Sequence, residues 1–340
     1  MNPTAASILR ISAALMATLL VGLPALWGAA ALWYQVPGGP APKAAMVVAW
    51  AVFSIAMLVL LWQVRVALGL LLFALVFACL LIWWTRLPPT NDHVWADDVA
   101  RITTGTIEGN RVTLYNVRNF DWRGKTDYTQ RWDTRSYDLD RLRSVDMIMS
   151  YWAGPAIAHM LISFGFDDGQ YVAFSVEIRR QRTQEFSEIG GFFKDFELSI
   201  IAADERDVIR VRTNIRGEED YLYQLRMPLS AMRSLFLGYV GEANALVDAP
   251  RFYNTVTVNC TTLVYQMMKR IVGHLPLDYR LLLSGYLPEY VYSVHGLNHD
   301  YSIEELKARG YITERARESD RSPNFSADIR RGLPGVVLPP

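Results

Sequence analysis

Residues 156–178 read AIAHMLISFGFDDGQYVAFSVEI and contain the clearest β-hairpin pattern in the chain. Two runs of apolar, β-branched and aromatic residues flank the turn Asp167-Asp168-Gly169. A three-residue hairpin loop places one residue in the left-handed region, where glycine meets no steric cost. With glycine there, Phe166 pairs with Gln170, and the two runs form adjacent antiparallel strands.

This register places His159 directly opposite Glu177, because each lies seven positions from the pair that closes the hairpin. Facing side chains on neighbouring strands have Cβ atoms roughly 5 Å apart. A carboxylate at that distance can orient an imidazole and fix its tautomer. The prediction depends on the turn, because a slip of one residue moves Glu177 to the other face. The alternative is a histidine that only fills an apolar strand.

Cys260 lies at the start of a predicted helix that covers Thr261–Val272 and ends at Gly273. A thiolate at a helix N-terminus gains from the free N–H groups and the helix dipole, which lower its pKa. The same N–H groups can stabilise an oxyanion. The alternative is an inert, buried cysteine that packs as a small apolar residue. Together with His159 and Glu177, Cys260 is the predicted catalytic set, with the thiol as nucleophile, the imidazole as base and the carboxylate as orienter.

Residues close to this set in the sequence are candidates for substrate binding: Tyr151, Tyr253, Asn254, Asn259 and Thr261. Asn259 has an alternative role, because asparagine directly before a helix commonly caps it. The pair His295 and His299 has the spacing of metal ligands, but no Cys, Asp or Glu cluster completes such a site. The sequence therefore predicts neither a metal nor a cofactor.

Strands and helices alternate without a regular repeat on both sides of the hairpin, which predicts an α+β domain over residues 87–313. Ser302 and Glu305 form a capping box for its last short helix. Beyond Thr313 the composition becomes polar and contains proline and glycine. Residues 314–340 are therefore expected to be a poorly ordered tail.

Residues 1–86 contain three apolar stretches, at 8–33, 44–64 and 66–84, which predict a membrane anchor of about three helices. Each has roughly the 20 residues that one crossing needs. The first stretch has an alternative interpretation as a cleaved signal peptide. Both interpretations place the domain outside the cytoplasm. The 34 basic and 34 acidic residues balance, so no nucleic-acid partner is expected.

The domain contains a set of motifs that are specific when taken together: Asn119-Phe120-Asp121, Ser150-Tyr151-Trp152 through Ala158-His159, Ser163 through Gly169, Ser175 through Arg179, and Asn259-Cys260-Thr261-Thr262. These motifs resemble the Lnb N-terminal periplasmic domain family, over about residues 91–283. The order of histidine before cysteine also resembles circularly permuted papain-like domains of the NlpC and lecithin–retinol acyltransferase type.

The resemblance implies a lipoprotein N-acyltransferase, which moves an acyl chain from a phospholipid to the N-terminal amine of a diacylated lipoprotein. Carried over by position, Cys260 would be the nucleophile, His159 the base and Glu177 the orienter. Membrane lipid and a lipoprotein acceptor are the partners that it implies. The location that it implies is the bacterial inner membrane, with several crossings and the soluble domain in the periplasm. Two alternatives stay open: a periplasmic cysteine amidase or peptidase acting on cell-wall or peptide amides, and a non-catalytic membrane-tethered binding domain.

Overall fold

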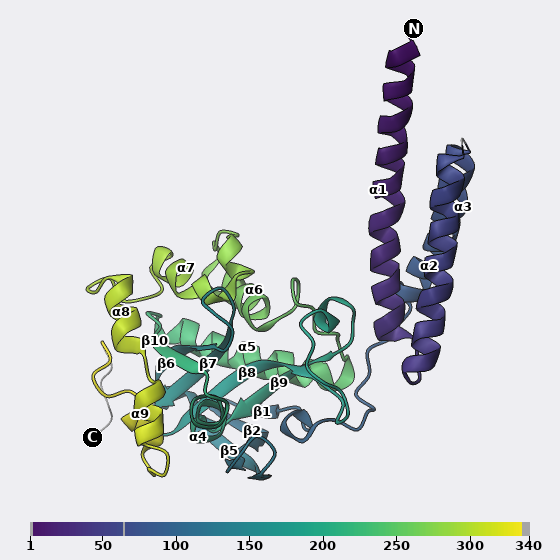
Figure 1. Ribbon diagram of the computed structural model, residues 1–340. Helices are drawn as coiled ribbons and strands as arrows, with labels where there is room; N and C mark the ends of the chain where they lie inside the picture. Colours follow the sequence, from purple (N-terminus) through teal and green to yellow (C-terminus); the bar gives the residue numbers. More distant parts are fainter. Residues whose placement is uncertain (1–2, 64, 335–340) are drawn as a thin grey trace. The chain divides into compact units, whose positions relative to one another are not determined.

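The computed structural model describes residues 3–63 and 65–334 of the 340-residue chain (Figure 1). The chain divides into two compact units. The first contains the residues up to Pro89 together with Ser187–Asp195, and the second contains the remainder, from Thr90 onward. A membrane unit and a separate mixed α/β unit are therefore both present, as the sequence predicts.

The first unit contains three helices, each long and apolar enough to cross a membrane. They are α1 (Pro3–Gln35), α2 (Pro40–Trp62) and α3 (Val66–Thr85). Trp50 of α2 holds the bundle together: its Nε1 donates to the Ala25 carbonyl of α1 at 2.8 Å, and its ring packs 5.8 Å from that of Phe73 on α3. A Cβ at Gly28 would lie 2.8 Å from the Trp50 ring, so glycine is needed for this close packing.

A short insertion from the later chain, Ser187–Asp195, also belongs to the first unit. The Gln35 amide at the end of α1 donates to the carbonyls of Phe193 and Lys194, both at 2.8 Å. The Phe193 ring stacks on Tyr34 with 5.6 Å between centroids. The insertion therefore covers the C-terminal end of α1 with aromatic and amide contacts, which are typical of a membrane–water boundary.

The second unit is built on an eight-stranded sheet with the order β1-β2-β9-β8-β7-β6-β10, in which β5 also pairs with β2 (Figure 1). Neighbouring strands are antiparallel except for the β2–β9 contact. A small two-stranded sheet of β3 and β4 lies outside it. The strands are β1 (Thr104–Glu108), β2 (Arg111–Arg118), β3 (Asp121–Trp122), β4 (Tyr128–Thr129), β5 (Trp132–Asp138), β6 (Leu142–Tyr151), β7 (Ala158–Phe166), β8 (Tyr171–Arg179), β9 (Glu197–Ala203) and β10 (Glu219–Gln224).

The β7–β8 hairpin has the predicted turn and register. The Phe166 N–H donates to the Gln170 carbonyl at 2.9 Å, and Gly169 has a φ of +80°. The ladder then runs from Gly165 opposite Tyr171 to Leu161 opposite Ser175. Glycine at the left-handed position therefore determines which side chains of the two strands face each other.

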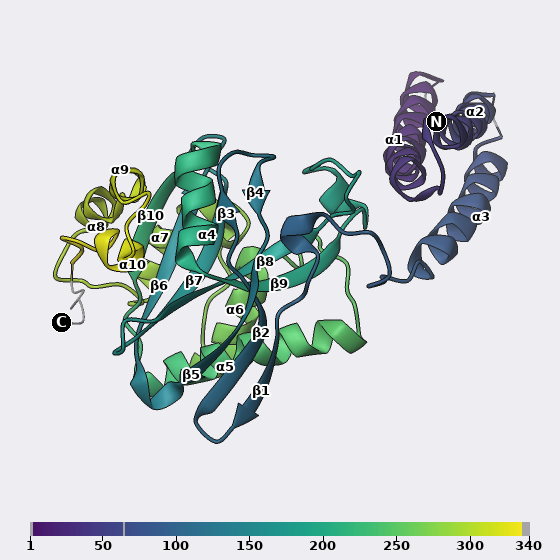
Figure 2. The same ribbon diagram turned by 90° about the horizontal axis from the view of Figure 1, so that it is seen from below.

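Helices cover both faces of the sheet (Figures 1 and 2). One face packs its larger core against α5, α6 and α7, and the other packs a smaller core against α4 and α9. The helices are α4 (Glu205–Arg210), continued by a π-helical stretch over Val211–Arg216, then α5 (Leu229–Asp248), α6 (Cys260–Val272), α7 (Leu287–Ser293), α8 (Ile303–Gly310), α9 (Thr313–Glu318) and α10 (Phe325–Asp328).

The expectation of a poorly ordered tail is wrong for residues 314–334. They form α9 and α10 and bury Phe325, Ile329 and Arg330. The physical reason is an ion-pair network that the local sequence does not reveal: the Arg330 guanidinium donates to Asp146 of β6 at 2.7 Å and to Glu205 of α4 at 2.6 Å. The final part of the expected tail, residues 335–340, lies outside the described residues.

Replacing Arg330 with alanine should destabilise the protein by about 3–5 kcal/mol, because the Asp146 and Glu205 carboxylates would remain buried without their cation. Arg331→Ala is the matched control, since the Arg331 side chain is 71% exposed and its guanidinium remains accessible to water while it pairs with Asp328. Urea unfolding of the full chain in detergent, followed by circular dichroism, measures the difference. Equal midpoints for the two variants would contradict a stabilising role for Arg330.

Candidate active site

The strands β7 and β8 separate at the end of the sheet where His159 and Glu177 lie. Their ladder stops at Leu161 and Ser175, although β7 stays paired with β6 as far as Ala158 and β8 with β9 as far as Arg179. Continuing the register by two residues places His159 opposite Glu177, as predicted from the turn. The His159 Nε2 lies 3.3 Å from the Glu177 Oε1.

Ser175 connects the imidazole and the carboxylate. Its Oγ lies 2.7 Å from the His159 Nε2 and donates to the Glu177 Oε1 at 2.6 Å. Because the serine proton is used by the carboxylate, the Oγ accepts from the ring, and Nε2 must carry a hydrogen. Nδ1 is then the ring nitrogen left for another partner. The two strands thus fix the tautomer as well as the position of His159.

The partner of the His159 ring is Cys260, the first residue of α6. α6 packs against both β7 and β8, and the thiol lies beside the His159 side chain and the Met160 backbone, which both lower its pKa. Even-numbered residues of β7 turn their N–H groups toward β8, as Phe166 does. The separation of the strands frees the Met160 N–H from the ladder, so it can donate to the sulfur.

These contacts shift the pKa values of both Cys260 and His159. Burial raises the pKa of the Cys260 thiol, but the His159 charge and hydrogen bond outweigh burial and lower it overall. Burial and the Arg212 charge lower the pKa of His159, whereas Glu177 and Cys260 raise it to about 9. The lowered pKa of the thiol and the raised pKa of the imidazole both favour the thiolate–imidazolium pair, which is the reactive form of a cysteine nucleophile.

Asn259 caps α6. Its Oδ1 accepts from the N–H groups of Thr261 at 2.9 Å and Thr262 at 2.8 Å, and its carbonyl accepts from Leu263. Within the described residues the structure gives no hydrogen-bond acceptor for the Cys260 N–H. It is therefore the amide of this first turn that can still donate to a substrate. It lies on the nucleophilic residue itself, where an oxyanion formed by attack of the sulfur would need a donor.

A buried network extends from Glu177 away from the thiol. Arg212 donates to Glu177 at 3.2 Å and to Glu218 at 3.1 Å. The Ser150 Oγ lies 2.6 Å from Glu218 and 2.5 Å from Asp220. The Ser150 hydroxyl is the donor in both contacts, and because one proton cannot fully serve two carboxylates, the arrangement favours proton uptake by Asp220. Consistently, burial raises the pKa of Asp220 to about 7, and Arg212 holds the pKa of Glu218 below its usual value despite burial.

The predicted substrate-binding residues lie in three places. Tyr253 and Thr261 lie at the thiol: the Cys260 charge contributes, after burial, to raising the pKa of Tyr253, and the Thr261 Oγ1 is 4.0 Å from the sulfur. Asn254 and Asn259 hold the backbone before α6, since the Asn254 Oδ1 accepts from Val256 and Thr257. Tyr151 donates to the Gly285 carbonyl at 2.7 Å.

His295 and His299 contact each other, with 3.2 Å between ring nitrogens, and both are exposed. His299 also stacks on the ring of Tyr292. Among the described residues, no group of three or more His, Cys, Asp or Glu side chains has the arrangement of a metal site. The contact between the two rings is therefore best described as a surface stacking arrangement.

Three groups at the site were missed by sequence reasoning: Ser175, Arg212 and the Met160 N–H. Ser175 could have been found, because it lies two residues before Glu177 and so shares its face of the strand. Arg212 lies in the π-helical stretch after α4, and no local pattern places it beside β8. The Met160 N–H becomes available only through the separation of the strands, which the hairpin pattern does not predict.

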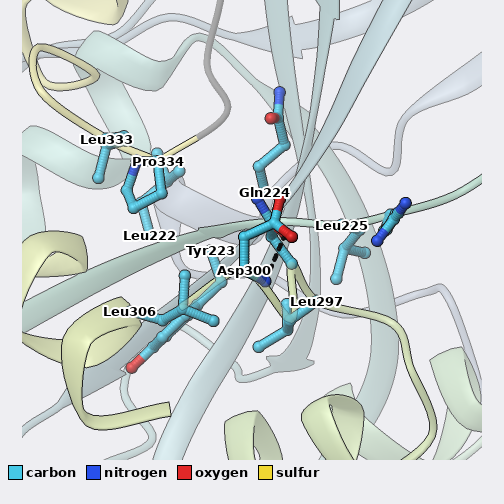
Figure 3. A pocket seen from close by; sticks show the side chains of 11 residues that line it. Leu222, Tyr223, Gln224, Leu225, Leu297, Asp300, Leu306, Leu333 and Pro334 are labelled. Carbon is cyan, nitrogen blue, oxygen red and sulfur yellow. Dashed lines mark hydrogen bonds between the residues drawn. The ribbon is translucent and has the colours of Figure 1, made fainter. Parts of the chain in front are cut away.

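A separate cavity of about 270 Å³ lies at β10. Figure 3 shows Leu222, Leu306 and Leu333 around it, with Asp300 nearby. The Asp300 N–H is already used by the Asn298 side chain, at 3.0 Å. Cys260 and His159 do not line this cavity, so it is distinct from the thiol site.

The ion pair predicts how the thiol should react with iodoacetamide. In a Cys79→Ala background, the alkylation rate of Cys260 should stay high as the pH falls through about 8.5, the usual thiol pKa, because His159 keeps the sulfur ionised. In His159→Gln the rate at pH 7 should fall by about 10-fold or more, since burial alone raises the pKa of the thiol. The same pH midpoint near 8.5 in both proteins would contradict the ion pair.

Comparison with known proteins agrees with this organisation. Residues 128–285 match the family model described as the Lnb N-terminal periplasmic domain. The match begins at β4 and ends just before α7, so it includes His159, Glu177 and Cys260. No curated protein and no solved structure matches the chain, and the resemblance to permuted papain-like domains stays a prediction. The chain is therefore a membrane protein with a periplasmic domain, and residues 128–285 of that domain match the Lnb N-terminal family.

Proposed function

We propose that the protein is a membrane-anchored thiol acyltransferase, in which Cys260 accepts an acyl chain from a phospholipid and passes it to an amine. The observation that supports this most directly is the contact of the Cys260 thiol with His159, itself oriented by Ser175 and Glu177. A nucleophile, a base and an orienting carboxylate in contact are the parts that covalent catalysis by cysteine needs.

The first step forms a thioester. The Cys260 thiolate attacks the ester carbonyl, the new C–S bond forms, and the Cys260 N–H stabilises the oxyanion. The C–O bond then breaks, and the leaving lysophospholipid oxygen takes the proton from the His159 imidazolium. The acyl chain remains on the sulfur, and His159 becomes a neutral base with Nε2–H still held by Ser175.

The second step transfers the chain. An amine attacks the thioester carbonyl, the C–N bond forms, and His159 takes the amine proton as the C–S bond breaks. The thiolate–imidazolium pair is thereby restored. Transfer rather than hydrolysis needs water kept from the thioester. Cys260 is 8% exposed and Tyr253 lies beside it, which supports a restricted approach for water.

The membrane anchor supports a lipid donor. α3 ends at Thr85 and the second unit begins at Thr90, so the connection spans at most roughly 18 Å when extended. The catalytic unit is therefore tethered close to a bilayer, which in a bacterial cell would be the inner membrane. The family resemblance favours the N-terminus of a lipoprotein as the accepting amine.

The test uses the full-length protein in vesicles that contain phospholipid with isotopically labelled acyl chains. Mass spectrometry of the Cys260 peptide should find one labelled acyl group, which hydroxylamine removes and an added amine converts to an amide. Release of cell-wall fragments without any lipid adduct would favour the cysteine amidase instead. A thiol that reacts with neither substrate would leave only a tethered binding domain.

A further inference from the structure

An apolar cavity of about 320 Å³ lies between α6 and the sheet, inside the second unit. One face of α6 lines it with residues three, four, seven and eleven positions apart, which a helix places in a single row. Facing them are Met147 of β6 and Met160 and Ile162 of β7. The row on α6 is Thr261, Val264, Tyr265, Met268 and Val272. Along the helix axis this row is roughly 16 Å long.

Cys260 and His159 do not line the cavity, but two of its lining residues, Thr261 and Met160, adjoin them in the chain. Thr261 follows Cys260 directly, and the Met160 backbone lies beside the sulfur. The far end lies past the C-terminus of α6, where His274 and Leu275 line it. The lining is mainly aliphatic, thioether and aromatic, and four methionines give it adaptable shape. This is the form expected of a site for a flexible hydrocarbon chain whose reactive end is at the thiol.

The chain segment that closes the far end is apolar on its outer side as well. Residues 272–283 contribute Val272, Leu275 and Leu281 to the cavity. The same segment exposes Leu277 at 81% and Tyr279 at 64%, together with Leu282 and Leu283. Single exposed apolar residues are ordinary, but several in one short segment beside a cavity mark a contact surface.

The charged side chains of residues 272–283, Asp278 and Arg280, form an ion pair with each other. The Arg280 guanidinium donates to both carboxylate oxygens of Asp278 at 2.8 Å. This bond lowers the pKa of Asp278 to about 2. A paired charge costs less to bring against an apolar medium than an isolated one. Leucine and tyrosine side chains around a closed ion pair suit the boundary between water and the acyl region of a bilayer.

We propose that residues 272–283 insert into the surface of the membrane and admit the acyl chain of a bilayer phospholipid into the cavity along α6. The inference rests on the proposed function for the fate of the chain, but the membrane contact does not. The hydrocarbon occupies the space lined by Val264, Met268 and Val272, and its ester carbonyl lies at Cys260.

The membrane contact is tested without any chemistry. Leu277→Cys is spin-labelled in a full-length Cys79→Ala/Cys260→Ala background and reconstituted in vesicles of phosphatidylethanolamine and phosphatidylglycerol. Ile107→Cys is the matched control, because Ile107 on β1 is 50% exposed on the same unit. The Leu277 label should collide more with oxygen than with a water-soluble nickel complex, and the Ile107 label should do the opposite. Equal exposure of both labels to the nickel complex overturns the proposal.

The cavity is tested by the length of the donor chain. Met268→Trp adds volume to the middle of the cavity and should lower the ratio of acylation rates, palmitoyl over butyryl phospholipid, by roughly 10-fold. Val247→Trp, at an exposed position of α5, should leave the ratio as in the unmodified protein. An unchanged ratio in Met268→Trp overturns the assignment of the cavity. Failure of the unmodified protein to take either chain would instead refute the proposed function, while the spin-label result would stand.

Discussion

Replacing Cys260 with serine should abolish the labile acyl adduct and lower acyl transfer by a factor on the order of 10³ or more. A serine hydroxyl stays protonated beside His159, whereas the imidazolium and the Met160 backbone lower the pKa of the thiol. Liquid chromatography with mass spectrometry of total product, from labelled phospholipid to an amine acceptor, measures the loss.

Cys79→Ser is the control for this experiment, because the second cysteine of the chain lies in α3. That variant should retain the adduct and the transfer rate. Serine is close in size to cysteine, so the capped start of α6 should fold in both variants, which circular dichroism can verify. Persistence of acyl transfer in Cys260→Ser would exclude the thioester mechanism.

Replacing His159 with glutamine should lower acyl transfer by a factor of about 10²–10⁴, the usual contribution of a positioned acid–base residue. The variant loses two functions at once, since the same ring ionises the thiol and protonates the leaving oxygen. The pH profile should change as well. The unmodified protein should lose activity as the pH rises through about 9, where His159 loses its proton, and His159→Gln should lack this decline.

The Ser175→Ala variant measures how much the serine hydroxyl contributes to orienting the His159 ring. It removes the hydroxyl between the ring and the carboxylate, but Glu177 still lies 3.3 Å from the His159 Nε2. The loss should therefore stay within about 10-fold, the value of one hydrogen bond. A loss in Ser175→Ala as large as that in His159→Gln would show that Ser175, rather than Glu177, orients the ring.

Much of the site followed from local sequence because its parts lie on regular elements. The turn ending in Gly169 fixes the register of β7 and β8, and the register fixes which residue faces His159. Asn259 and Gly273 mark the two ends of α6, so the position of Cys260 on its first turn was predictable. These inferences need only backbone preferences over a few residues, which is why they could be made without the fold.

The C-terminal segment could not be predicted in this way. Its composition is polar, and its helices α9 and α10 are short. It is held by Arg330, whose partners Asp146 and Glu205 lie far away in the chain. Composition reports the average environment of a segment, whereas one buried ion pair can determine whether that segment is attached.

The sequence by itself therefore determined three membrane helices, a hairpin with His159 opposite Glu177, and a cysteine at the head of a capped helix. Only the tertiary structure decided that α6 packs where β7 and β8 separate, so that the thiol contacts the ring and the Met160 N–H. It also decided that Arg212 reaches Glu177 and that an apolar cavity follows α6. The helices, the hairpin and the capped helix start can be predicted because their backbone hydrogen bonds join residues that are near in sequence. The features that the tertiary structure decided depend on packing between elements up to a hundred residues apart, which no local preference specifies.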